Sequence, residues 1–583
     1  MGNLAVAKPV IEIIASSGAL DLAQLPMTDL GNAERFQRRF GHQFRYTTAK
    51  GWLGWDGRRW CVLDQEDKVT PAAVQEAVFA TVRAVQDEAA ALAESGVCNG
   101  PEFPKKWEAA LEAGVDIFCA FELGGRDRWV IKGTKVELLS ELLAKHGRSS
   151  EAAGKLGCIP TLAKRWLTVP IEEFDTDPDV VNCLSGTVRF VKVNGATVAQ
   201  LRPHERGDLL TRLAPVDFTP DVEVPAPVYD AMMIWAQPED DMRDYLHRWG
   251  GYSATGHIGE QKLQFWYGKG ANGKSTVIDA WAHALGDYSG SIGIETFLDQ
   301  GIKKRGDAAS PDLARLGGVR MLRASEPERG ARLNEALIKA ATGGEPMAVR
   351  ALHKGFFELV PQFKLTIGGN YRPDIPGTDE GIWRRVKLVP WDSYREEHER
   401  DDDLPNKLKA EAAGIFARMI AGAVRWYNDG LAEPEKVKAA TQQYRDESDP
   451  LARFLRLCTA MSPDGRIQSS RLYEVFVAWC KAAGEKEWST KGFAKAMQDK
   501  GFHKKASDGM QWLGLVLTRE VGDFIDSEGR VKSLPDDMSL EPSSSAIIAT
   551  RAPDGAGGQN DGLPSENPDD WRNALGRDDD DPF

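Results

Sequence analysis

The sequence predicts a multidomain α/β protein whose central domain contains a parallel sheet. The chain has 583 residues, which is too long for one hydrophobic core, and its composition of 42% hydrophobic and 27% charged residues is typical of globular proteins. A glycine-rich stretch at 268–276 lies between an apolar run at 263–267 and a helical pattern beginning near 276. Two further apolar runs, at 318–326 and 363–370, end on polar side chains. These features together predict strands, loops and helices in α/β order.

The glycine-rich stretch matches the phosphate-binding pattern G-x-x-x-x-G-K-[ST] in full. Its glycines allow successive N–H groups to wrap a phosphate chain. The strand before it and the helix after it favour this interpretation over a turn that matches by chance. We therefore expect a nucleoside triphosphate here, with Lys274 on the β- and γ-phosphates and the Ser275 hydroxyl on Mg²⁺. The predicted loop consists of Gly268, Lys269, Gly270, Ala271, Asn272, Gly273, Lys274, Ser275 and Thr276.

Polar residues at the ends of the later strands are candidates for the hydrolysis chemistry. Glu326 ends the first apolar run, where it can orient water beside Mg²⁺, and Glu328 could share that task. Asn370 ends the second run, where its amide could contact water beside the γ-phosphate, although an Asn that caps a turn is the plainer reading. The adjacent Arg384 and Arg385 are either a solvated face or arginine fingers that reach a neighbouring subunit.

The order of this lysine, glutamate, asparagine and arginine pair resembles that of superfamily III helicases, which are hexameric AAA+ motors. The resemblance extends over about 225–445, through the stretches 248–252, 314–328 and 338–345, and is close to the branch that contains the phage and plasmid primase-helicases and the poxvirus primase-helicase. It implies ATP as substrate, Mg²⁺ held by Ser275 and Glu326, and a ring, expected to be a hexamer. It also implies 3′→5′ movement on single-stranded or forked DNA, with Asn370 as sensor. Arg385 is the first choice for the arginine finger and Arg384 the second.

The same resemblance suggests where DNA would bind. The family carries a DNA-gripping hairpin between the acid and the sensor, and here that segment is 348–357, with His353 and Lys354 at its tip. Residues 449–519 predict three helices followed by two strands, the order of a winged helix. Lys491 and Lys495 lie on its third helix, which would enter a major groove. A solvated lysine face is the alternative.

The chain is predicted to contain five segments. Residues 29–214 are predicted to contain a short helix at 32–39, a hairpin of strands 51–55 and 59–63, a long helix at 71–95 and strands over 179–193, and helices are predicted to fill 403–446. Residues 29–214 resemble the α+β helicase-associated N-terminal domain of the same branch, which serves assembly or coupling. A proline-rich stretch at 215–227 marks the boundary before the motor. The full division is 1–28 loosely ordered, 29–214 N-terminal domain, 215–446 P-loop motor with flanking helices, 447–520 winged-helix module and 521–583 disordered acidic tail.

The charge, the cysteine content and the hydropathy of the chain bear on nucleic-acid binding, on disulfide and zinc sites and on localisation. The net charge of −14 argues against nucleic acid, but residues 551–583 hold nine acidic residues against three arginines and account for six of those charges. The seven cysteines form no C-x-x-C pair, so buried thiols are expected rather than disulfides or zinc. No apolar run reaches membrane-spanning length and no signal peptide begins the chain, so we expect a cytoplasmic protein, in a bacterial host, without a membrane partner.

The remaining predictions concern partners and alternatives. Asp175 and Asp177 form a D-x-D pair that could hold metal ions in a primase, but no partner motif is evident, so a separate primase is expected. The end of the chain, Asp578 to Phe583, resembles the acidic tip of bacterial single-stranded DNA-binding proteins, and would recruit host replication proteins. The leading hypothesis is a replicative helicase of a phage or mobile element. The alternatives are a DNA-binding initiator ATPase that does not unwind, a primase-helicase with residual primase function, and a regulatory ATPase switch.

Overall fold

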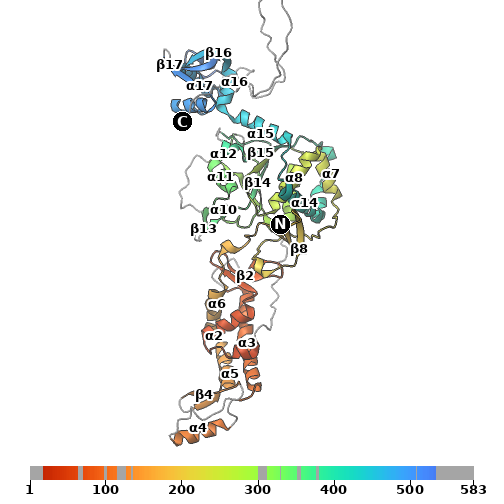
Figure 1. Ribbon diagram of the computed structural model, residues 1–583, viewed down its shortest axis with the longest axis vertical. Coiled ribbons are helices and arrows are strands. Elements are labelled where there is room, and N and C mark those ends of the chain that lie inside the picture. The colour runs from red at the N-terminus through yellow and green to blue at the C-terminus, as the bar shows by residue number, and fades with distance from the viewer. Residues whose placement is uncertain are drawn as a thin grey trace, which may run out of the picture. The chain divides into compact units, whose positions relative to one another are not determined.

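The computed structural model describes ten ranges of the chain: 18–63, 70–97, 102–113, 126–132, 135–299, 311–328, 330–350, 356–375, 380–506 and 509–532. The chain divides into two compact units, residues 1–456 and 457–583 (Figure 1). No helix within these ranges is both long enough and apolar enough to cross a membrane.

The first part of the larger unit is mainly helical. Helix α2 begins where Thr28 caps the amide of Gly31, and its buried Arg35 pairs with Glu88 of α3 at 2.8 Å. The predicted helix, hairpin and long helix over residues 32–95 are confirmed, whereas residues 19–23 form a helix in a segment expected to be loose. The elements are α1 (Ala19–Ala23), α2 (Asp29–Phe40), β1 (Phe44–Thr47), β2 (Gly51–Trp55), β3 (Trp60–Val62), α3 (Ala72–Glu94), α4 (Phe103–Glu112), β4 (Trp129–Lys132), β5 (Lys135–Leu138), α5 (Leu139–Ser150) and α6 (Ala153–Leu167).

A small antiparallel sheet and two helices connect this part to the central sheet. The sheet has the order β6-β7-β8, and its strands pair as successive hairpins. The strands predicted over 179–193 are confirmed by β6 and β7. The bounds are η2 (Ile171–Glu173), β6 (Val180–Cys183), β7 (Gly186–Val193), β8 (Ala196–Arg202), η3 (Arg206–Asp208), α7 (Pro227–Ala236) and α8 (Asp240–Ala254).

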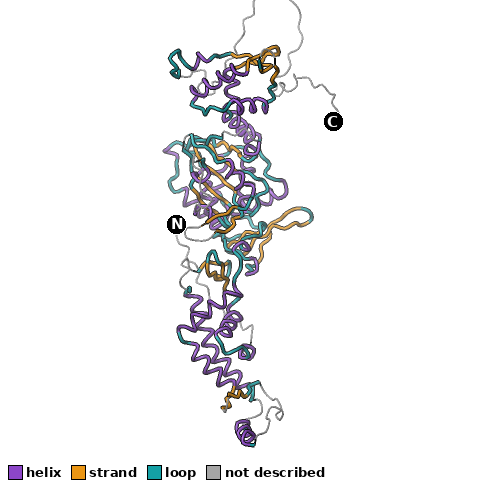
Figure 2. Tube along the Cα trace, turned by 90° about the vertical axis from the view of Figure 1, so that its left-hand side faces the viewer, coloured by secondary structure: helices purple, strands orange, loops and turns teal. Residues whose placement is uncertain are grey.

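The central sheet has five parallel strands in the order β10-β11-β14-β9-β15, and helices and loops surround it (Figure 2). Met321 pairs with Lys364, and Leu263 with Val386, so the strands begin at one edge and end at the other. The predicted parallel sheet is therefore confirmed. The strands and nearby short elements are β9 (Leu263–Tyr267), η4 (Gly286–Tyr288), β10 (Ser289–Ile292), η5 (Ile294–Phe297), α10 (Pro311–Ala314), β11 (Met321–Ala324), β14 (Lys364–Gly369) and β15 (Val386–Pro390).

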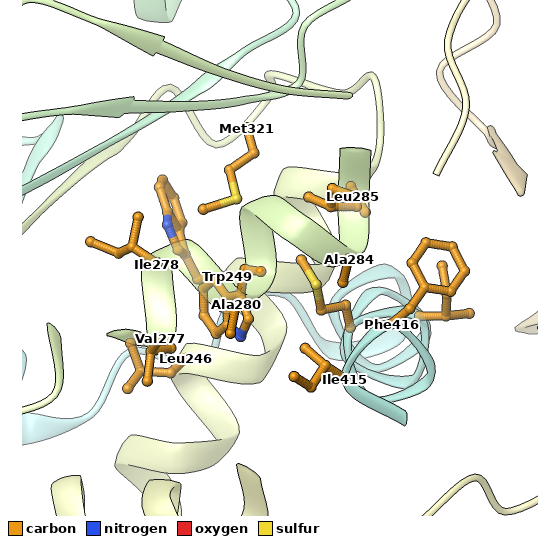
Figure 3. Close-up of a cluster of buried hydrophobic side chains, with 14 of the residues drawn as sticks. Leu246, Trp249, Val277, Ile278, Ala280, Ala284, Leu285, Met321, Ile415 and Phe416 are labelled. Carbon is orange, nitrogen blue, oxygen red and sulfur yellow. The ribbon is translucent and has the colours of Figure 1, made fainter. Parts of the chain in front are cut away.

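The main hydrophobic core lies around α9 (Lys274–Leu285), between the sheet and helices α8 and α14 (Ala412–Asp429) (Figure 3). The indole N–H of Trp249 on α8 donates to Thr366 Oγ1 of β14 at 2.9 Å, which ties the helix to the sheet. Helices α8 and α14 approach so closely that a Cβ at Gly251 would lie 2.0 Å from the amide nitrogen of Ala423. This close approach explains Gly251, whereas a Cβ at Gly250 would lie 3.2 Å from the ring of Trp281 on α9.

The remaining elements of the larger unit include the predicted hairpin. Strands β12 and β13 pair antiparallel, which confirms that hairpin, while its connecting residues, with His353 and Lys354, lie outside the described ranges. The helices predicted to fill 403–446 are also confirmed. The bounds are α11 (Glu335–Gly343), β12 (Met347–Arg350), β13 (Phe356–Leu359), α12 (Glu380–Trp383), η6 (Glu397–Glu399), α13 (Leu404–Ala410) and α15 (Glu435–Ser448).

The C-terminal unit contains a three-stranded antiparallel sheet in the order β16-β18-β17. The three predicted helices and two late strands are confirmed, but β16 was not predicted. Its residues Ser462 to Gly465 have turn-forming types, and the pairing register shifts between Met461 and Arg466 to accommodate them. The bounds here are α16 (Pro450–Cys458), which crosses the boundary between the units, β16 (Thr459–Gln468), α17 (Ser469–Ala483), α18 (Thr490–Asp499), β17 (Lys504–Ala506), β18 (Met510–Leu517) and α19 (Val521–Phe524).

The expectation that the cysteines are buried thiols is only partly correct. Five cysteines lie in the described ranges, and none of these five is in a disulfide. Cys183, Cys458 and Cys480 are buried, Cys61 is half-buried and Cys158 is exposed on α6. Burial of the Cys61 thiol, together with its hydrogen bond to Asp56, raises its pKa to about 12.

Candidate nucleotide-binding site

The carboxyl ends of β9, β11 and β14 meet at one edge of the central sheet. The glycine-rich loop follows β9, Glu326 lies two residues beyond β11, and Asn370 follows β14 directly. These segments enclose a cavity of about 240 Å³. Its lining consists of Gly270, Ala271, Asn272, Gly273, Lys274, Ser275, Thr276, Glu326, Gly368, Gly369 and Asn370. The structure therefore brings together residues that are about one hundred positions apart in the sequence.

The backbone of the loop is shaped to receive an anion. Gly270 and Gly273 have φ values of +94° and +83°, in the left-handed region that favours glycine. Gly268 has no room for a side chain, because a Cβ there would lie 2.2 Å from the carbonyl oxygen of Trp391. Helix α9 begins at Lys274, two residues earlier than predicted, and its N-terminus faces the cavity. Free N–H groups and the helix dipole at such an end attract phosphate.

Lys274 is held in place by oxygen atoms on three sides. Its Nζ donates to Gly268 O at 2.8 Å, to Asn272 Oδ1 at 3.1 Å and to Asn370 Oδ1 at 3.3 Å. Burial lowers the pKa of Lys274, and the nearby Glu326 carboxylate opposes part of this effect. The ammonium is thus already aimed at the cavity and partly stripped of water. The amide of Asn272 also donates to Trp391 O at 3.0 Å, which fixes the loop to the end of β15.

The carboxylate of Glu326 is oriented by the backbone that follows β14. Its Oε1 accepts from the amides of Asn370 at 2.7 Å and Tyr371 at 3.0 Å. Gly369 permits this approach, since a Cβ there would lie 3.1 Å from Glu326 Cγ. Glu328 is exposed and, among the described residues, is not part of the cavity lining. The geometry therefore separates the two acids that the sequence could not distinguish.

The cavity fits the triphosphate and the Mg²⁺ that the sequence implies. The Ser275 hydroxyl and the Glu326 carboxylate both line it, and oxygen atoms are the ligands that Mg²⁺ prefers. Elsewhere the described residues contain no cluster of three His, Cys, Asp or Glu side chains that could hold a metal ion. The D-x-D pair does not form one: Asp175 accepts from the amide of Thr211 at 2.8 Å, and Asp177 pairs with Arg189 at 2.9 Å.

A second cavity, of about 680 Å³, shares Ala271, Gly273 and Thr276 with the loop. Its far side is largely apolar, and the guanidinium of Arg395 lies 4.2 Å from the centre of the Trp235 ring. The amide of Arg395 also donates to Ala271 O at 3.1 Å, so this wall is attached to the loop. The rest of the lining is Pro227, Val228, Ala231, Met232, Arg400, Asp401, Asp402, Leu404 and Pro405. These residues were not predicted from the sequence, because they form no motif. They come from two segments, one before β9 and one after β15 in the sequence.

A third cavity, of about 550 Å³, lies on the other side of Ser275 and Glu326. Arg323 of β11 lines it and pairs with Asp279 of α9. Arg315 also lines it and donates to Ser291 O at 2.9 Å. The carboxyl edge of the sheet is thus open on both sides of the phosphate-binding loop.

The two candidate arginine fingers lie at the opposite edge of the sheet. Arg384 and Arg385 directly precede β15, whose start is aligned with the start of β9. Arg385 is 8% exposed, and its Nε donates to Thr342 Oγ1 at 3.1 Å. Arg384 is exposed and donates to Gln261 Oε1 at 2.9 Å. Neither serves the loop of its own chain, and the finger role stays a prediction, for which the exposed Arg384 is the better placed.

Of the predicted DNA-binding residues, the structure describes only those in the C-terminal unit. Lys491 and Lys495 are exposed on α18, and Lys505 is exposed on β17. The ammonium of Lys504 lies 4.5 Å from the ring centre of Trp512, which anchors one lysine over the sheet. The terminal segment from Asp578 to Phe583 lies outside the described ranges.

Comparison with protein families finds one match. Residues 33–238 match the family described as "D5 N terminal like". The match covers the helical part, the sheet β6–β8 and helix α7, and so extends past residue 214, where the sequence predicted the end of the N-terminal domain. This is a likeness of about a third of the chain.

Three curated proteins of large DNA viruses are similar to a part of the chain. "Putative helicase L207/L206" of Acanthamoeba polyphaga mimivirus is 28% identical over 236 residues, which cover 38% of this chain and 24% of that protein. "Putative helicase 022R" of Frog virus 3 is 27% identical over 263 residues, which cover 42% of this chain and 27% of that protein. "Putative helicase 184R" of Invertebrate iridescent virus 6 is 23% identical over 277 residues. The matched segments span about a quarter of these relatives.

Among solved structures, the apo C terminal region of NrS-1 is similar in part. One form covers 58% of this chain and 95% of that chain at 11% identity, with a TM-score of 0.33. Another covers 70% and 98% at 13% identity, with a TM-score of 0.37. At these scores the likeness adds nothing to the functional argument.

Proposed function

We propose that the protein is an ATP-dependent replicative DNA helicase of a phage or another mobile element, related to the D5-type primase-helicases. The observation that carries the proposal is the convergence of Lys274, Glu326 and Asn370 on one cavity at the carboxyl edge of a parallel sheet. The similarity to named helicases of large DNA viruses supports it.

In this proposal the loop and the N-terminus of α9 hold the phosphates of ATP, and Lys274 contacts the β- and γ-phosphates. Ser275 and Glu326 would hold Mg²⁺, which supplies positive charge against the charge that develops on the transferred phosphoryl group. Glu326 orients the attacking water, because two backbone amides fix one of its oxygens and turn the carboxylate toward the cavity. Asn370 reports the γ-phosphate, because its side chain already contacts Lys274.

The nucleoside occupies the cavity of about 680 Å³ beside the loop. That volume lies within the range of small-molecule sites, and the site has the usual character of apolar walls with a few polar groups. The ring of Trp235 provides a flat apolar surface for the base. Asp401 and Asp402 are the acceptors in the lining that could take ribose hydroxyls.

The site is completed by a neighbouring chain. An arginine that stabilises the transition state is worth roughly 10³–10⁵ in rate, yet the arginine pair lies at the opposite edge of its own sheet. A head-to-tail contact that repeats around an axis closes into a ring. We propose a hexamer, with Arg384 ahead of Arg385 as the finger that reaches the next subunit.

DNA passes through this ring on the β12–β13 hairpins, with His353 and Lys354 on the phosphates and 3′→5′ movement. The C-terminal unit runs helix, strand, helix, helix, strand, strand, and we propose that it is a winged helix whose α18 approaches DNA. A separate primase, and host replication proteins that bind the terminal segment, are further proposed partners.

Strand displacement on a forked duplex tests the main proposal, with Lys274→Ala as the control. ATP-dependent unwinding by the wild type that the variant loses supports the helicase. Hydrolysis that DNA stimulates without unwinding supports the initiator-type ATPase, and the exposed lysines of the C-terminal unit give that alternative its basis. Hydrolysis that DNA does not affect contradicts both.

A second test addresses the C-terminal unit. Replacing both Lys491 and Lys495 by alanine should lower the slope of log affinity against log salt by roughly 2 and weaken DNA binding. Lys481→Ala on α17 is the matched control, because its ammonium faces Glu487 at 3.7 Å and is not on the proposed surface. Equal salt slopes for the wild type and the double variant would remove α18 from the interface.

A further inference from the structure

Two buried cations lie at the amino edge of the central sheet, opposite the nucleotide-binding cavity. Arg320 directly precedes β11 and is 0% exposed, and Lys364 is the first residue of β14 and is 2% exposed. Within the described part of the chain neither forms an ion pair. Burial, and secondarily the Arg320 guanidinium, lower the pKa of Lys364 well below its usual value. A buried cation without a carboxylate is costly, so its contacts need a reason.

The partners of both cations are backbone carbonyls, and all of them except Gln362 O come from other segments. Arg320 donates to Val180 O, to Ala254 O at 3.0 Å and to Asp177 O at 3.1 Å. Lys364 Nζ donates to Thr255 O at 2.5 Å and to Gln362 O at 2.9 Å. The rings of Tyr288 and Tyr252 complete the enclosure, at 4.7 Å from the Arg320 guanidinium carbon and 5.0 Å from Lys364 Nζ.

The carbonyls of Asp177 and Val180, both partners of Arg320, belong to the segment that leads from the helical part to β6. Those of Ala254 and Thr255 lie at the end of α8, so Arg320 contacts both segments, whereas Lys364 contacts the end of α8. The segment 175–180 follows η2 and ends at the first residue of β6, within the region that matches the "D5 N terminal like" family. Gln362, between the β12–β13 hairpin and β14, adds a third link, since its amide donates to Asp175 O at 3.0 Å. The packing is tight: a Cβ at Gly256 would lie 2.7 Å from Pro178 Cα.

Each of these two strands carries a functional residue at its other end, at the same spacing. Glu326 lies six residues after Arg320, and Asn370 lies six residues after Lys364. The strands are adjacent and in register, with Met321 beside Lys364 and Ala324 beside Ile367. A displacement of either strand along its axis therefore moves a buried cation at one edge and a nucleotide-contacting group at the other.

We propose that Arg320 and Lys364 are positioning residues that couple the nucleotide state sensed by Glu326 and Asn370 to the segment 175–180 of the N-terminal domain. This proposal rests on the proposed ATPase function. Strands are stiff along their axis, and energetic coupling needs a physical connection of this kind between two sites. Backbone carbonyls as partners make the connection independent of the side chains in the segment 175–180.

Lys364→Met tests the coupling, because it removes the ammonium but keeps a buried chain of similar length, and replacing a buried ion by an apolar residue often preserves stability. Gln362→Met removes the link to Asp175 O. Arg248→Met is the matched control. Arg248 is also a buried guanidinium that donates to a backbone carbonyl, Gly430 O at 2.8 Å, although unlike the two cations at the amino edge it also pairs with Asp244 at 2.6 Å. It joins α8 to the end of α14 and starts no strand.

Hydrogen–deuterium exchange of the amides in 175–180 is measured with and without Mg²⁺ and adenylyl imidodiphosphate. We expect the analogue to change exchange in the wild type and in Arg248→Met by at least about 5-fold, and by less than about 2-fold in Lys364→Met and Gln362→Met. Affinity for the analogue should stay within about 3-fold in all four proteins. In turnover assays, Lys364→Met should keep its basal rate within about 2-fold and lose most of the stimulation by DNA.

The possible failures are distinguishable. A wild type that binds the analogue without a change at 175–180 overturns the coupling and leaves the ATPase proposal intact. A response that persists in both test variants, or that Arg248→Met loses equally, also overturns it. A wild type that does not bind the analogue overturns the ATPase proposal and the coupling with it. A uniform loss of affinity and thermal midpoint in Lys364→Met alone would assign this lysine a purely structural role.

Discussion

The two edges of the central sheet carry similar charged residues in opposite environments, open at the carboxyl edge and enclosed at the amino edge. At the carboxyl edge, Lys274 and Glu326 border open cavities and are held by only a few hydrogen bonds. At the amino edge, Arg320 and Lys364 are buried, and backbone carbonyls and aromatic rings enclose their charged groups. A charged group at the carboxyl edge is available to a ligand, whereas the charged groups at the amino edge already bind groups of the protein itself.

This difference teaches that charge and sequence position alone do not identify a functional residue. The cations at both edges adjoin parallel strands. Burial lowers the pKa of a lysine at each edge, Lys274 at the carboxyl edge and Lys364 at the amino edge. What separates them is the solvent-accessible space beside the charged group. The comparison therefore predicts rate effects for changes at the carboxyl edge and stability or coupling effects for changes at the amino edge.

The largest effect is expected for Glu326→Gln. The amide oxygen can still accept from the Asn370 amide, so the loop geometry should persist, but the negative charge that orients water is lost. We expect kcat for ATP hydrolysis to fall by about 10²–10³-fold, with analogue affinity nearly unchanged. Steady-state hydrolysis and equilibrium binding measure the two quantities. Glu328→Gln is the control, and a comparable loss there would contradict the separation of the two acids.

A smaller effect is expected for Trp235→Ala, which removes the flat wall of the cavity of about 680 Å³. Loss of one aromatic contact with the base is worth roughly 1–1.5 kcal/mol, so KM for ATP should rise about 10-fold while kcat stays within about 2-fold. The neighbouring Ile234 is 57% exposed and does not line this cavity, so Ile234→Ala serves as the control. A fall in kcat without a rise in KM would place the nucleoside elsewhere.

The smallest effect on rate, and a clear effect on stability, is expected for Gly256→Ala at the amino edge. Its Cβ would lie 2.7 Å from Pro178 Cα, so the backbone must shift at a cost of about 1–3 kcal/mol. Basal hydrolysis by the folded protein should be unchanged. Gly259→Ala is the control, because a Cβ there meets nothing within 4 Å. Thermal unfolding compares the two variants, and equal midpoints would show that this edge tolerates movement.

Much of the carboxyl edge could be predicted from the sequence, because each of its residues directly follows a strand with a recognisable apolar run. The P-loop pattern, Glu326 and Asn370 all belong to this kind. The wall formed by Trp235 and Arg395 could not be predicted, because it assembles from segments 160 residues apart that carry no pattern of their own. Such a site forms through packing between distant segments, which the local sequence pattern does not predict.

The amino edge was not foreseen for a different reason. Arg320 and Lys364 each stand at the boundary of an apolar run, where a charged residue is usually a solvated strand end. The segment 175–180 covers Arg320 at that edge, while Thr255, Gln362 and the ring of Tyr252 enclose Lys364. Strand β16 was missed because its turn-like residues are accommodated by a register shift, which single-residue propensity does not reveal. In both cases the tertiary environment overrides the local signal.

Strand β15 has a consequence for mixtures of intact and defective chains. It begins directly after Arg384 and Arg385, and it ends just before Trp391, whose carbonyl accepts from the side-chain amide of Asn272 in the loop. In the proposed ring each chain would donate an arginine to one neighbour and receive one from the other through the two ends of this single strand. A chain misfolded at β15 would then inactivate two sites rather than one. A minority of such chains would therefore inhibit the assembly in a dominant-negative way.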